Sequence, residues 1–354
     1  MLCLWVFLTL SGLVQRTLGS PGDWLDEFID CKELCEASIP CAGFEGIEIP
    51  SGASAEITYF TEASAIQKYF LFWDCKSNCD YQCQQVVTQI RIAEGEKVVQ
   101  FHGKWPFKRL FGMQELFSTL FSVANFFPHY RGYKLLQREL SRLPARKRSR
   151  FILKKYLYVA IAGMLAWTSS SIFHFRDLEV TEKLDYFFAG ATVLSGFHGI
   201  LIRILRLDKS DQFRHAVTAA VLLIFSLHVL RLYLDWSYTY NMRFNVLFGL
   251  LQYILLLTLA YKNYRQLKAG KLPRKSHHPP RENLYFELCV VPVALVVGTA
   301  LAMSCELFDF FSYSWQIDSH AIWHACTVLP SWKLYDFFLH DFHYLDACED
   351  SSSD

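Results

Sequence analysis

The sequence "SSSIFHFRDLEVTEKLD", residues 169–185, is a polar connection between two long apolar segments. The flanking segments, near 154–174 and 186–206, each approach the ~20 residues that a helix needs to cross the hydrocarbon core of a bilayer. Because unpaired backbone groups cannot face lipid, both segments are predicted to be helices. A serine, a histidine and an aspartate therefore stand where two membrane helices are joined, a position at which polar side chains are costly and usually functional.

The same apolar pattern recurs along the chain, which is 52% hydrophobic and has a positive mean hydropathy. Seven segments have spanning length: residues near 111–130, 154–174, 186–206, 215–235, 243–262, 287–305 and 320–339. The predicted fold class is therefore an all-α membrane protein, a seven-transmembrane helix bundle that occupies residues 106–340. A net charge of +1 argues against nucleic acid as a partner.

The N-terminal part of the chain predicts export. An apolar run in residues 1–19 followed by small residues is typical of a signal peptide, with an uncleaved anchor as the alternative. Residues 20–105 then lack a spanning segment and hold six cysteines: Cys31, Cys35, Cys41, Cys75, Cys79 and Cys83. An even set of cysteines behind a signal peptide predicts three disulfides in a small domain in an oxidising lumen, and the pairing is left open. A zinc site is the alternative, which the spacing of three residues within each close pair disfavours.

The charged loops predict the orientation. The connections around 131–155, 203–214 and 262–281 are rich in Lys and Arg, which places them in the cytosol. The other connections are short and mostly acidic or neutral, so they are expected in the lumen. The N-terminal domain is then lumenal, in agreement with its cysteines, and residues 341–354 form a cytosolic tail.

Polar residues gather at the lumenal ends of three predicted spans. Ser170 and His174 are four residues apart and share one helix face, and Asp185 opens the next span. His320 and His324 are also four apart, at the start of the last span. Three imidazoles from separate helices, with a fourth position left for water, predict a catalytic zinc site.

Other polar residues are candidates for a supporting role. They fit the same lumenal side less firmly, and each is a candidate to hold an imidazole in its metal-binding tautomer, although capping or packing is the simpler role: Glu115, Asn125, Glu306, Asp309 and Asp318. His198 and His228 are interpreted as ordinary hydrogen-bonded residues.

These motifs resemble a known superfamily. The Ser-x3-His of "SSIFH", the aspartate eleven residues after that histidine, and the His-x3-His of "HAIWH" resemble the metal motif of the CREST superfamily of seven-span hydrolases. Within it, "FHGKWPF" (101–107), "FRDLEVTEKLDYF" and "DSHAIWH", behind paired lumenal cysteine clusters, resemble the Per-one-like or post-GPI-attachment-to-proteins family of GPI-anchor remodelling phospholipases.

The resemblance implies an activity and roles for five residues. It implies a zinc-dependent GPI-specific phospholipase A2 that removes the sn-2 acyl chain from the lipid of GPI-anchored proteins. His174, His320 and His324 would bind Zn²⁺, Asp185 would act as the base for the attacking water, and Ser170 would place a hydroxyl beside them.

The partners would be GPI-anchored proteins and membrane lipids, and the expected location is the endoplasmic reticulum membrane, with the Golgi membrane as the alternative. The rival functions are another lipid amidase or esterase of the superfamily, and a non-enzymatic seven-span receptor or assembly factor with structural zinc.

Overall fold

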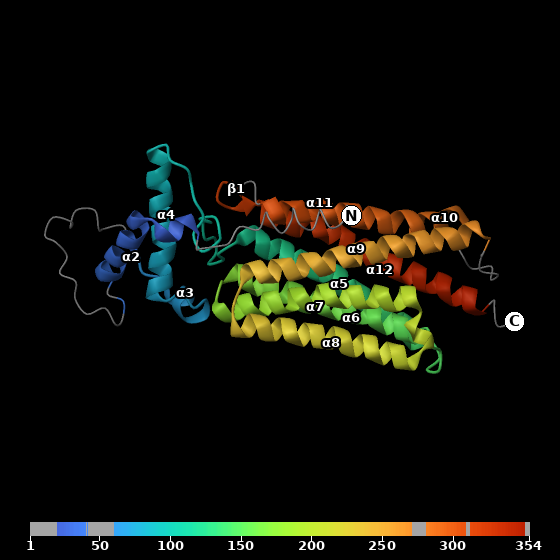
Figure 1. Cartoon of the computed structure of the whole chain (residues 1–354). Helices are drawn as coiled ribbons and strands as arrows, with labels where there is room; N and C mark the ends of the chain where they lie inside the picture. Colours follow the sequence, from blue (N-terminus) through green and yellow to red (C-terminus); the bar gives the residue numbers. More distant parts are fainter. Residues whose placement is uncertain (1–19, 40, 42–59, 271–280, 309–311, 351–354) are drawn as a thin grey trace. The chain divides into compact units, whose positions relative to one another are not determined.

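The computed structural model describes residues 20–39, 41, 60–270, 281–308 and 312–350. The expected signal peptide, residues 1–19, lies outside this part of the chain. The described residues are predominantly α-helical, with one pair of two-residue strands, which confirms the all-α class (Figure 1). The chain divides into two compact units: residues 1–116 with 311–318, and residues 117–310 with 319–354.

The first unit is built on two disulfide-linked helices. Its elements are the 3₁₀ helix η1 (Pro21–Trp24), α2 (Asp26–Ser38), α3 (Ala65–Phe70), α4 (Cys75–Ala93), and the strands β1 (Ser312–Tyr313) and β2 (Ile317–Asp318). The side chain of Asp74 caps α4 by accepting from the backbone N–H of Ser77 at 2.7 Å, which satisfies a donor that the helix itself leaves unpaired.

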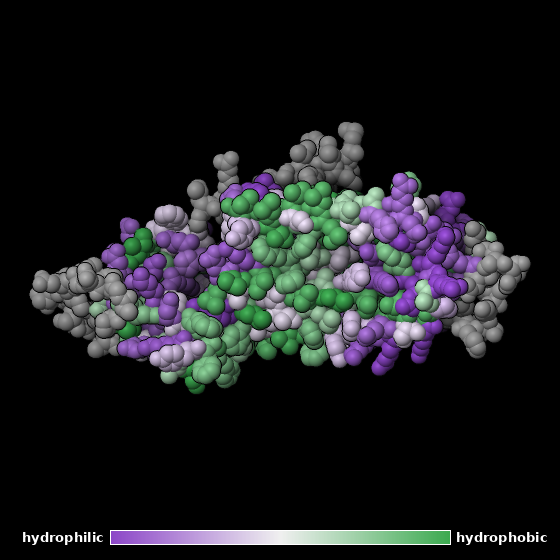
Figure 2. All heavy atoms as spheres, turned by 90° about the horizontal axis from the view of Figure 1, so that it is seen from below, coloured by the Kyte–Doolittle hydropathy of each residue, from purple (hydrophilic) through white to green (hydrophobic). Residues whose placement is uncertain are grey.

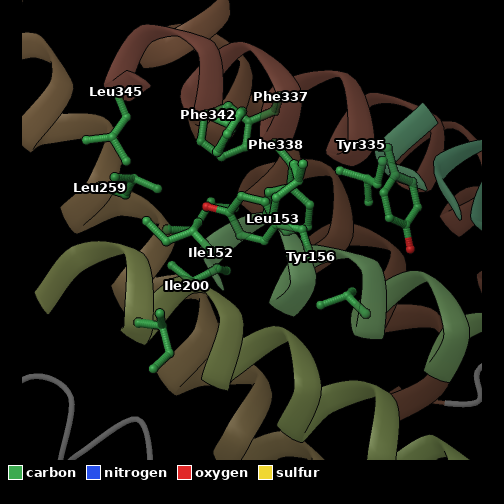
Figure 3. Packing of buried hydrophobic residues seen from close by; sticks show 14 of the residues in the cluster. Ile152, Leu153, Tyr156, Ile200, Leu259, Tyr335, Phe337, Phe338, Phe342 and Leu345 are labelled. Carbon is green, nitrogen blue, oxygen red and sulfur yellow. The ribbon is translucent and has the colours of Figure 1, made fainter. Parts of the chain in front are cut away.

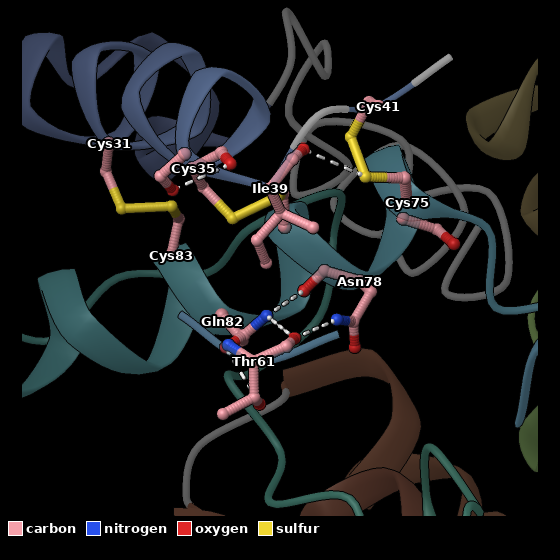
Figure 4. Close-up of a disulfide and its surroundings, with 12 residues drawn as sticks. Cys31, Cys35, Ile39, Cys41, Thr61, Cys75, Asn78, Gln82 and Cys83 are labelled. Carbon is pink, nitrogen blue, oxygen red and sulfur yellow. Dashed lines mark hydrogen bonds between the residues drawn. A yellow bond between two sulfur atoms is a disulfide. The ribbon is translucent and has the colours of Figure 1, made fainter. Parts of the chain in front are cut away.

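The disulfides pair the cysteines in reverse order: Cys31–Cys83, Cys35–Cys79 and Cys41–Cys75 (Figure 4). Cysteines four residues apart share one helix face, so two helices that run in opposite directions bring them together in nested pairs. The prediction of three disulfides is confirmed. The alternative of a zinc site is wrong for these six residues, because their sulfur atoms are bonded to one another and offer no thiolate.

The segment "FHGKWPF" completes the first unit. Phe101 is buried in the core beside Phe28, with ring centroids 4.7 Å apart. The next residue, His102, places its imidazole between two carboxylates, with Nε2 at 2.9 Å from Asp80 and Nδ1 at 3.3 Å from Asp23. Its backbone N–H also donates to Asp23 at 2.7 Å, so His102 connects η1 to α4.

The second unit is a bundle of long helices. Its elements are α5 (Leu116–Arg142), α6 (Arg150–Phe175), α7 (Glu179–Leu205), the 3₁₀ helix η3 (Leu207–Lys209), α8 (Asp211–Leu234), α9 (Tyr238–Lys268), α10 (Arg281–Tyr285), the π-helix η4 (Phe286–Val290), α11 (Val291–Phe308) and α12 (Ser319–Asp350).

Five of its helical segments are long and apolar enough to cross a membrane: Arg150–Phe175, Glu179–Leu205, Asp211–Leu234, Tyr238–Lys268 and Asn283–Phe308. Figure 2 shows hydrophobic residues gathered over the middle of these helices and hydrophilic residues at the end that leads to the C-terminus. The protein is therefore an all-α, multi-pass membrane protein.

The helices α5 and α12 stand where the first and seventh spans were predicted, but neither contains a stretch as continuously apolar as those of the other five. They pack closely against each other: a Cβ atom on Gly132 of α5 would lie 2.3 Å from the ring of Tyr335 on α12. Seven spans therefore remain a prediction, of which five are supported by length and composition.

The core of the bundle lies between α6, α7, α9 and α12. The rings of Tyr156 and Phe338 stack with centroids 3.9 Å apart, and both side chains are buried (Figure 3). Helix α12 does not end at residue 340, where the sequence suggested that a tail begins. It continues to Asp350 because Asp341, Phe342 and Tyr344 are buried and keep the helical spacing of the core.

Candidate metal centre

Three imidazoles meet in the second unit. His174 lies in the last turn of α6, and His320 and His324 lie in the first two turns of α12. One nitrogen of each ring lies within 4.8 Å of the others, and the Nε2 atoms of His174 and His320 are 3.2 Å apart. His174 and His324 are buried. The structure thus brings together the three histidines that the sequence selected.

The carboxylate of Glu306 orients His320. Glu306, on α11, is hydrogen-bonded to Nδ1 of His320 and accepts from the hydroxyl of Tyr238 at 3.4 Å. With Nδ1 on the carboxylate, Nε2 of His320 is the nitrogen that faces His174. A carboxylate on the outer nitrogen of an imidazole is the usual support for a metal-binding histidine. Among the supporting candidates that the structure describes, Glu306 is hydrogen-bonded to an imidazole of the centre.

Two residues of α5 form hydrogen bonds with His324, one with its imidazole and one with its backbone. The hydroxyl of Ser122 lies 2.9 Å from Nδ1 of His324 and 3.1 Å from the hydroxyl of Ser170. Asn125 donates to the backbone carbonyl of His324 at 2.7 Å, so this predicted partner supports the backbone of α12 and not an imidazole. Ser170 is thus connected to His324 through Ser122.

The remaining predicted residues have other positions. Asp185 is half-buried in the second turn of α7, and its role as a base stays a prediction. Glu115 belongs to the first unit, where its carboxylate lies 2.6 Å from the ammonium of Lys104. Asp318 is buried in β2 of the first unit, and Asp309 lies outside the described residues.

Ser122 is not among the residues that the sequence selected, although a signal for it exists in the spacing along α5. Four buried polar residues recur on α5 at helical spacing: Ser118, Ser122, Asn125 and His129. Such a stripe on a long helix indicates a face turned toward other polar groups in the bundle. The last of the four, His129, accepts from the indole N–H of Trp167 at 3.1 Å and lies 2.6 Å from the hydroxyl of Tyr335.

The interpretation as ordinary hydrogen-bonded residues holds for His198 and is wrong for His228, whose two ring nitrogens are buried without a partner among the described residues. His198 is within 3.2 Å of the hydroxyl of Thr218, and His228 stacks on Phe244 with ring centroids 3.7 Å apart.

Aromatic rings cover the centre. The ring of Trp323 lies 5.2 Å from that of His320 and 4.9 Å from that of His324, and Trp167 meets His324 edge-on at 5.1 Å. These rings lower the polarity around the imidazoles, while the side chain of His320 remains 27% exposed. Three neutral nitrogen donors in such a setting favour Zn²⁺ over Mg²⁺ or Ca²⁺, and three protein ligands leave one position open. The residues present therefore fit a zinc ion.

Comparison with known proteins adds independent information. Residues 65–342 match the sequence profile of the Per1-like family. Protein PER1 of Saccharomyces cerevisiae is 54% identical over 335 residues, which cover 92% of this chain and 93% of the relative. The GPI-specific phospholipase A2-like protein PGAP3 of Homo sapiens is 32% identical, covering 94% of this chain and 92% of the relative. No solved structure matches the chain.

Proposed function

Because the chain belongs to the Per1-like family, we propose that it is a GPI-specific phospholipase A2 that uses zinc. It would hydrolyse the sn-2 ester of the lipid of GPI-anchored proteins, releasing a fatty acid and a lyso-lipid. The observation that carries the proposal is the convergence of three imidazoles within 4.8 Å, two of which have Nδ1 on an oxygen atom.

The histidines and their partners form the binding part of the site. His174, His320 and His324 hold the ion, while Glu306 and Ser122 keep two of the rings in orientation. Bound there, zinc would lower the pKa of water and polarise the ester carbonyl. The aromatic rings of Trp167 and Trp323 lower the polarity around the reacting ester.

Asp185 and Ser170 form the reacting part. The carboxylate of Asp185 takes a proton from the attacking water as the bond from oxygen to the carbonyl carbon forms. It returns the proton to the glycerol oxygen when the bond between that oxygen and the carbonyl carbon breaks. The hydroxyl of Ser170 helps to place the ester. It is hydrogen-bonded to the hydroxyl of Ser122, which in turn contacts His324.

The same proposal includes the topology. Seven spans, with residues 20–105 in the lumen and the C-terminal end of α12 in the cytosol, put the histidine centre in the lumenal leaflet of the endoplasmic reticulum or Golgi membrane. A protease added to sealed microsomes should cut within residues 131–153 and 263–284 and spare residues 20–105. Protection of both basic loops would contradict this orientation.

The activity is tested with the purified full-length protein in lipid nanodiscs that contain a GPI lipid. We expect fatty-acid release that a chelator stops and added zinc restores. Ceramide in place of the GPI lipid tests the rival amidase, and metal analysis of the same sample tests the rival structural role. A protein that binds zinc and releases fatty acid from neither lipid would contradict the proposed enzyme.

A further inference from the structure

The hydroxyl of Ser122 stands at a junction of three helices. It is fully buried on α5 and lies within hydrogen-bonding distance of three atoms. These are the backbone carbonyl of Ser118 at 2.7 Å, Nδ1 of His324 at 2.9 Å and the hydroxyl of Ser170 at 3.1 Å. The three neighbours belong to α5, α12 and α6.

Because the hydroxyl of Ser122 has a single proton, it can be the donor in only one of these three hydrogen bonds. A serine hydroxyl has one proton to donate and two lone pairs that accept. The carbonyl of Ser118 can only accept, so the proton of Ser122 goes to it, as is common for a serine and the carbonyl four residues earlier. His324 and Ser170 must then donate to Ser122.

A second contact supports this direction. Nδ1 of His324 also lies 3.4 Å from the carbonyl oxygen of Ser118, which again can only accept. The hydroxyl oxygen of Ser122 and the carbonyl oxygen of Ser118 therefore both accept from Nδ1, which must carry the proton. The neutral ring then carries its lone pair on Nε2.

The neighbouring His129 shows that the partner of Nε2 matters as well as the tautomer. The indole N–H of Trp167 can only donate, so Nε2 of His129 accepts and its proton is on Nδ1, toward Tyr335. His129 thus has the same tautomer as His324, but its Nε2 already accepts a hydrogen bond from Trp167 and cannot bind a metal at the same time. This explains why one histidine of the polar stripe on α5 is a packing residue.

We propose that Ser122 is a positioning residue that fixes His324 in the tautomer with the proton on Nδ1, so that Nε2 is the nitrogen that binds the metal. The inference rests on the proposed zinc site. The same hydroxyl of Ser122 accepts the hydrogen bond that Ser170 donates. The oxygen of Ser170 can then act as an acceptor toward the site. Ser122 does for His324 what Glu306 does for His320, with a neutral acceptor in place of a charged one.

The tautomer can be read without metal or substrate. In full-length protein labelled with ¹⁵N-histidine, the nitrogen chemical shifts of His324, assigned from a His324→Gln variant, separate a protonated ring nitrogen from an unprotonated one. We expect protonation on Nδ1 in the wild type and a mixture of tautomers in Ser122→Ala. A wild-type His324 protonated on Nε2 would overturn the inference.

Metal affinity supplies the second measurement. Ser122→Ala should weaken zinc binding by ~10–100-fold, the usual cost of losing a partner on the outer nitrogen of a ligand, and should change the visible absorption of bound Co²⁺. Ser122→Thr keeps the hydroxyl and should restore both. Ser171→Ala is the matched control, because Ser171 makes the same bond to the carbonyl four residues earlier, Trp167, without an imidazole partner.

The results separate this role from the proposed activity. Ser122→Ala with wild-type zinc affinity, or with a loss equal to that of Ser171→Ala, would contradict the positioning role. A chain that binds metal as described and releases no fatty acid would contradict the phospholipase and leave the role of Ser122 intact.

Discussion

The helical bundle contains two networks of polar side chains, and they differ in how the unfavourable burial of polar groups is compensated. In one, Arg203 of α7 forms two bonds to Asp341 of α12, at 2.6 and 2.9 Å, and Asn263 of α9 donates to the same carboxylate at 2.9 Å. In the other, three imidazoles from α6 and α12 turn nitrogen atoms toward one another.

The difference lies in where the opposite charge comes from. The charge of Arg203 is matched by Asp341 within the protein, so the two charges of this network balance and connect α7 to α12, although Oδ1 of Asn263 is buried without a hydrogen-bond partner. In the histidine centre the oxygen partners of His320 and His324 lie on the Nδ1 side, while Nε2 of His320 faces Nε2 of His174. A pair of opposite charges therefore needs no ligand, although removing one partner is costly, whereas converging imidazole lone pairs form a site for a cation.

The largest effect is expected where a converging nitrogen is removed. His320→Ala should lose zinc and fatty-acid release together, and by more than the ~10–100-fold that loss of an outer partner costs. Metal analysis and GPI-lipid turnover of the same preparation measure both. His343→Ala, on an exposed part of the same helix, is the control and should keep zinc and activity.

Removing the base should separate metal from chemistry. Asp185→Asn keeps the size and hydrogen bonding of the side chain but cannot accept a proton, so turnover should fall by ~10²–10⁴ while zinc stays. Glu179→Gln, in the exposed first turn of the same helix, should have no such effect. Full activity of Asp185→Asn, or loss of its zinc, would show that Asp185 has a different role.

Breaking the pair of opposite charges should cost stability and spare the metal. Asp341→Leu leaves the guanidinium of Arg203 buried without its carboxylate, which should lower the free energy of unfolding by ~3–5 kcal/mol. The double variant Arg203→Met/Asp341→Leu removes both charges and should recover most of that loss. Thermal unfolding in detergent measures this, with zinc content per folded molecule as the second readout.

A second ion pair on the same helix provides the control for burial. The carboxylate of Asp346 lies 2.6 Å from Lys147, and both side chains are partly exposed. Asp346→Asn should therefore cost no more than ~1 kcal/mol. If Asp341→Leu were equally mild, the loss of one buried partner would not be as costly as we infer.

The smallest effect is expected in the first unit, where the polar cluster is partly open to water. The hydrogen bond that the imidazole of His102 donates to Asp80, with the nearby charge of Asp23, raises the pKa of His102 against its burial, and the same bond lowers the pKa of Asp80. Stability from His102 is thus fully present below its unfolded pKa of ~6.5 and is lost as the pH rises through its folded pKa.

This pH dependence can be measured by hydrogen exchange. In the full chain, His102→Gln should reduce amide protection in residues 97–107 more at pH 6 than at pH 8.5, by no more than ~1 kcal/mol because the imidazole is half-exposed. Equal loss at both pH values would mean that His102 acts through its backbone bond to Asp23 and not through its charge.

Much of the architecture was predictable because it depends on short distances along the chain. Apolar segments of spanning length predicted the helices from α6 to α11, and the spacing of four residues predicted that His320 and His324 share a face. The six cysteines predicted three disulfides. The sequence predicted a cytosolic tail at residues 341–354, and it gave no sign that α12 runs on to Asp350 or that Asp341 is buried against Arg203.

The sequence by itself determined the helical class, the disulfide-rich N-terminal unit and the choice of His174, His320 and His324, because periodicity and residue chemistry are local properties. Only the tertiary structure decided which cysteine pairs with which, that Asp341 belongs to Arg203, and that Ser122 connects His324 to Ser170. These partners are 52, 138 and 202 residues apart in the chain for Cys31–Cys83, Arg203–Asp341 and Ser122–His324. Their contacts depend on which helix faces pack together, and packing is settled by the burial of many side chains at once.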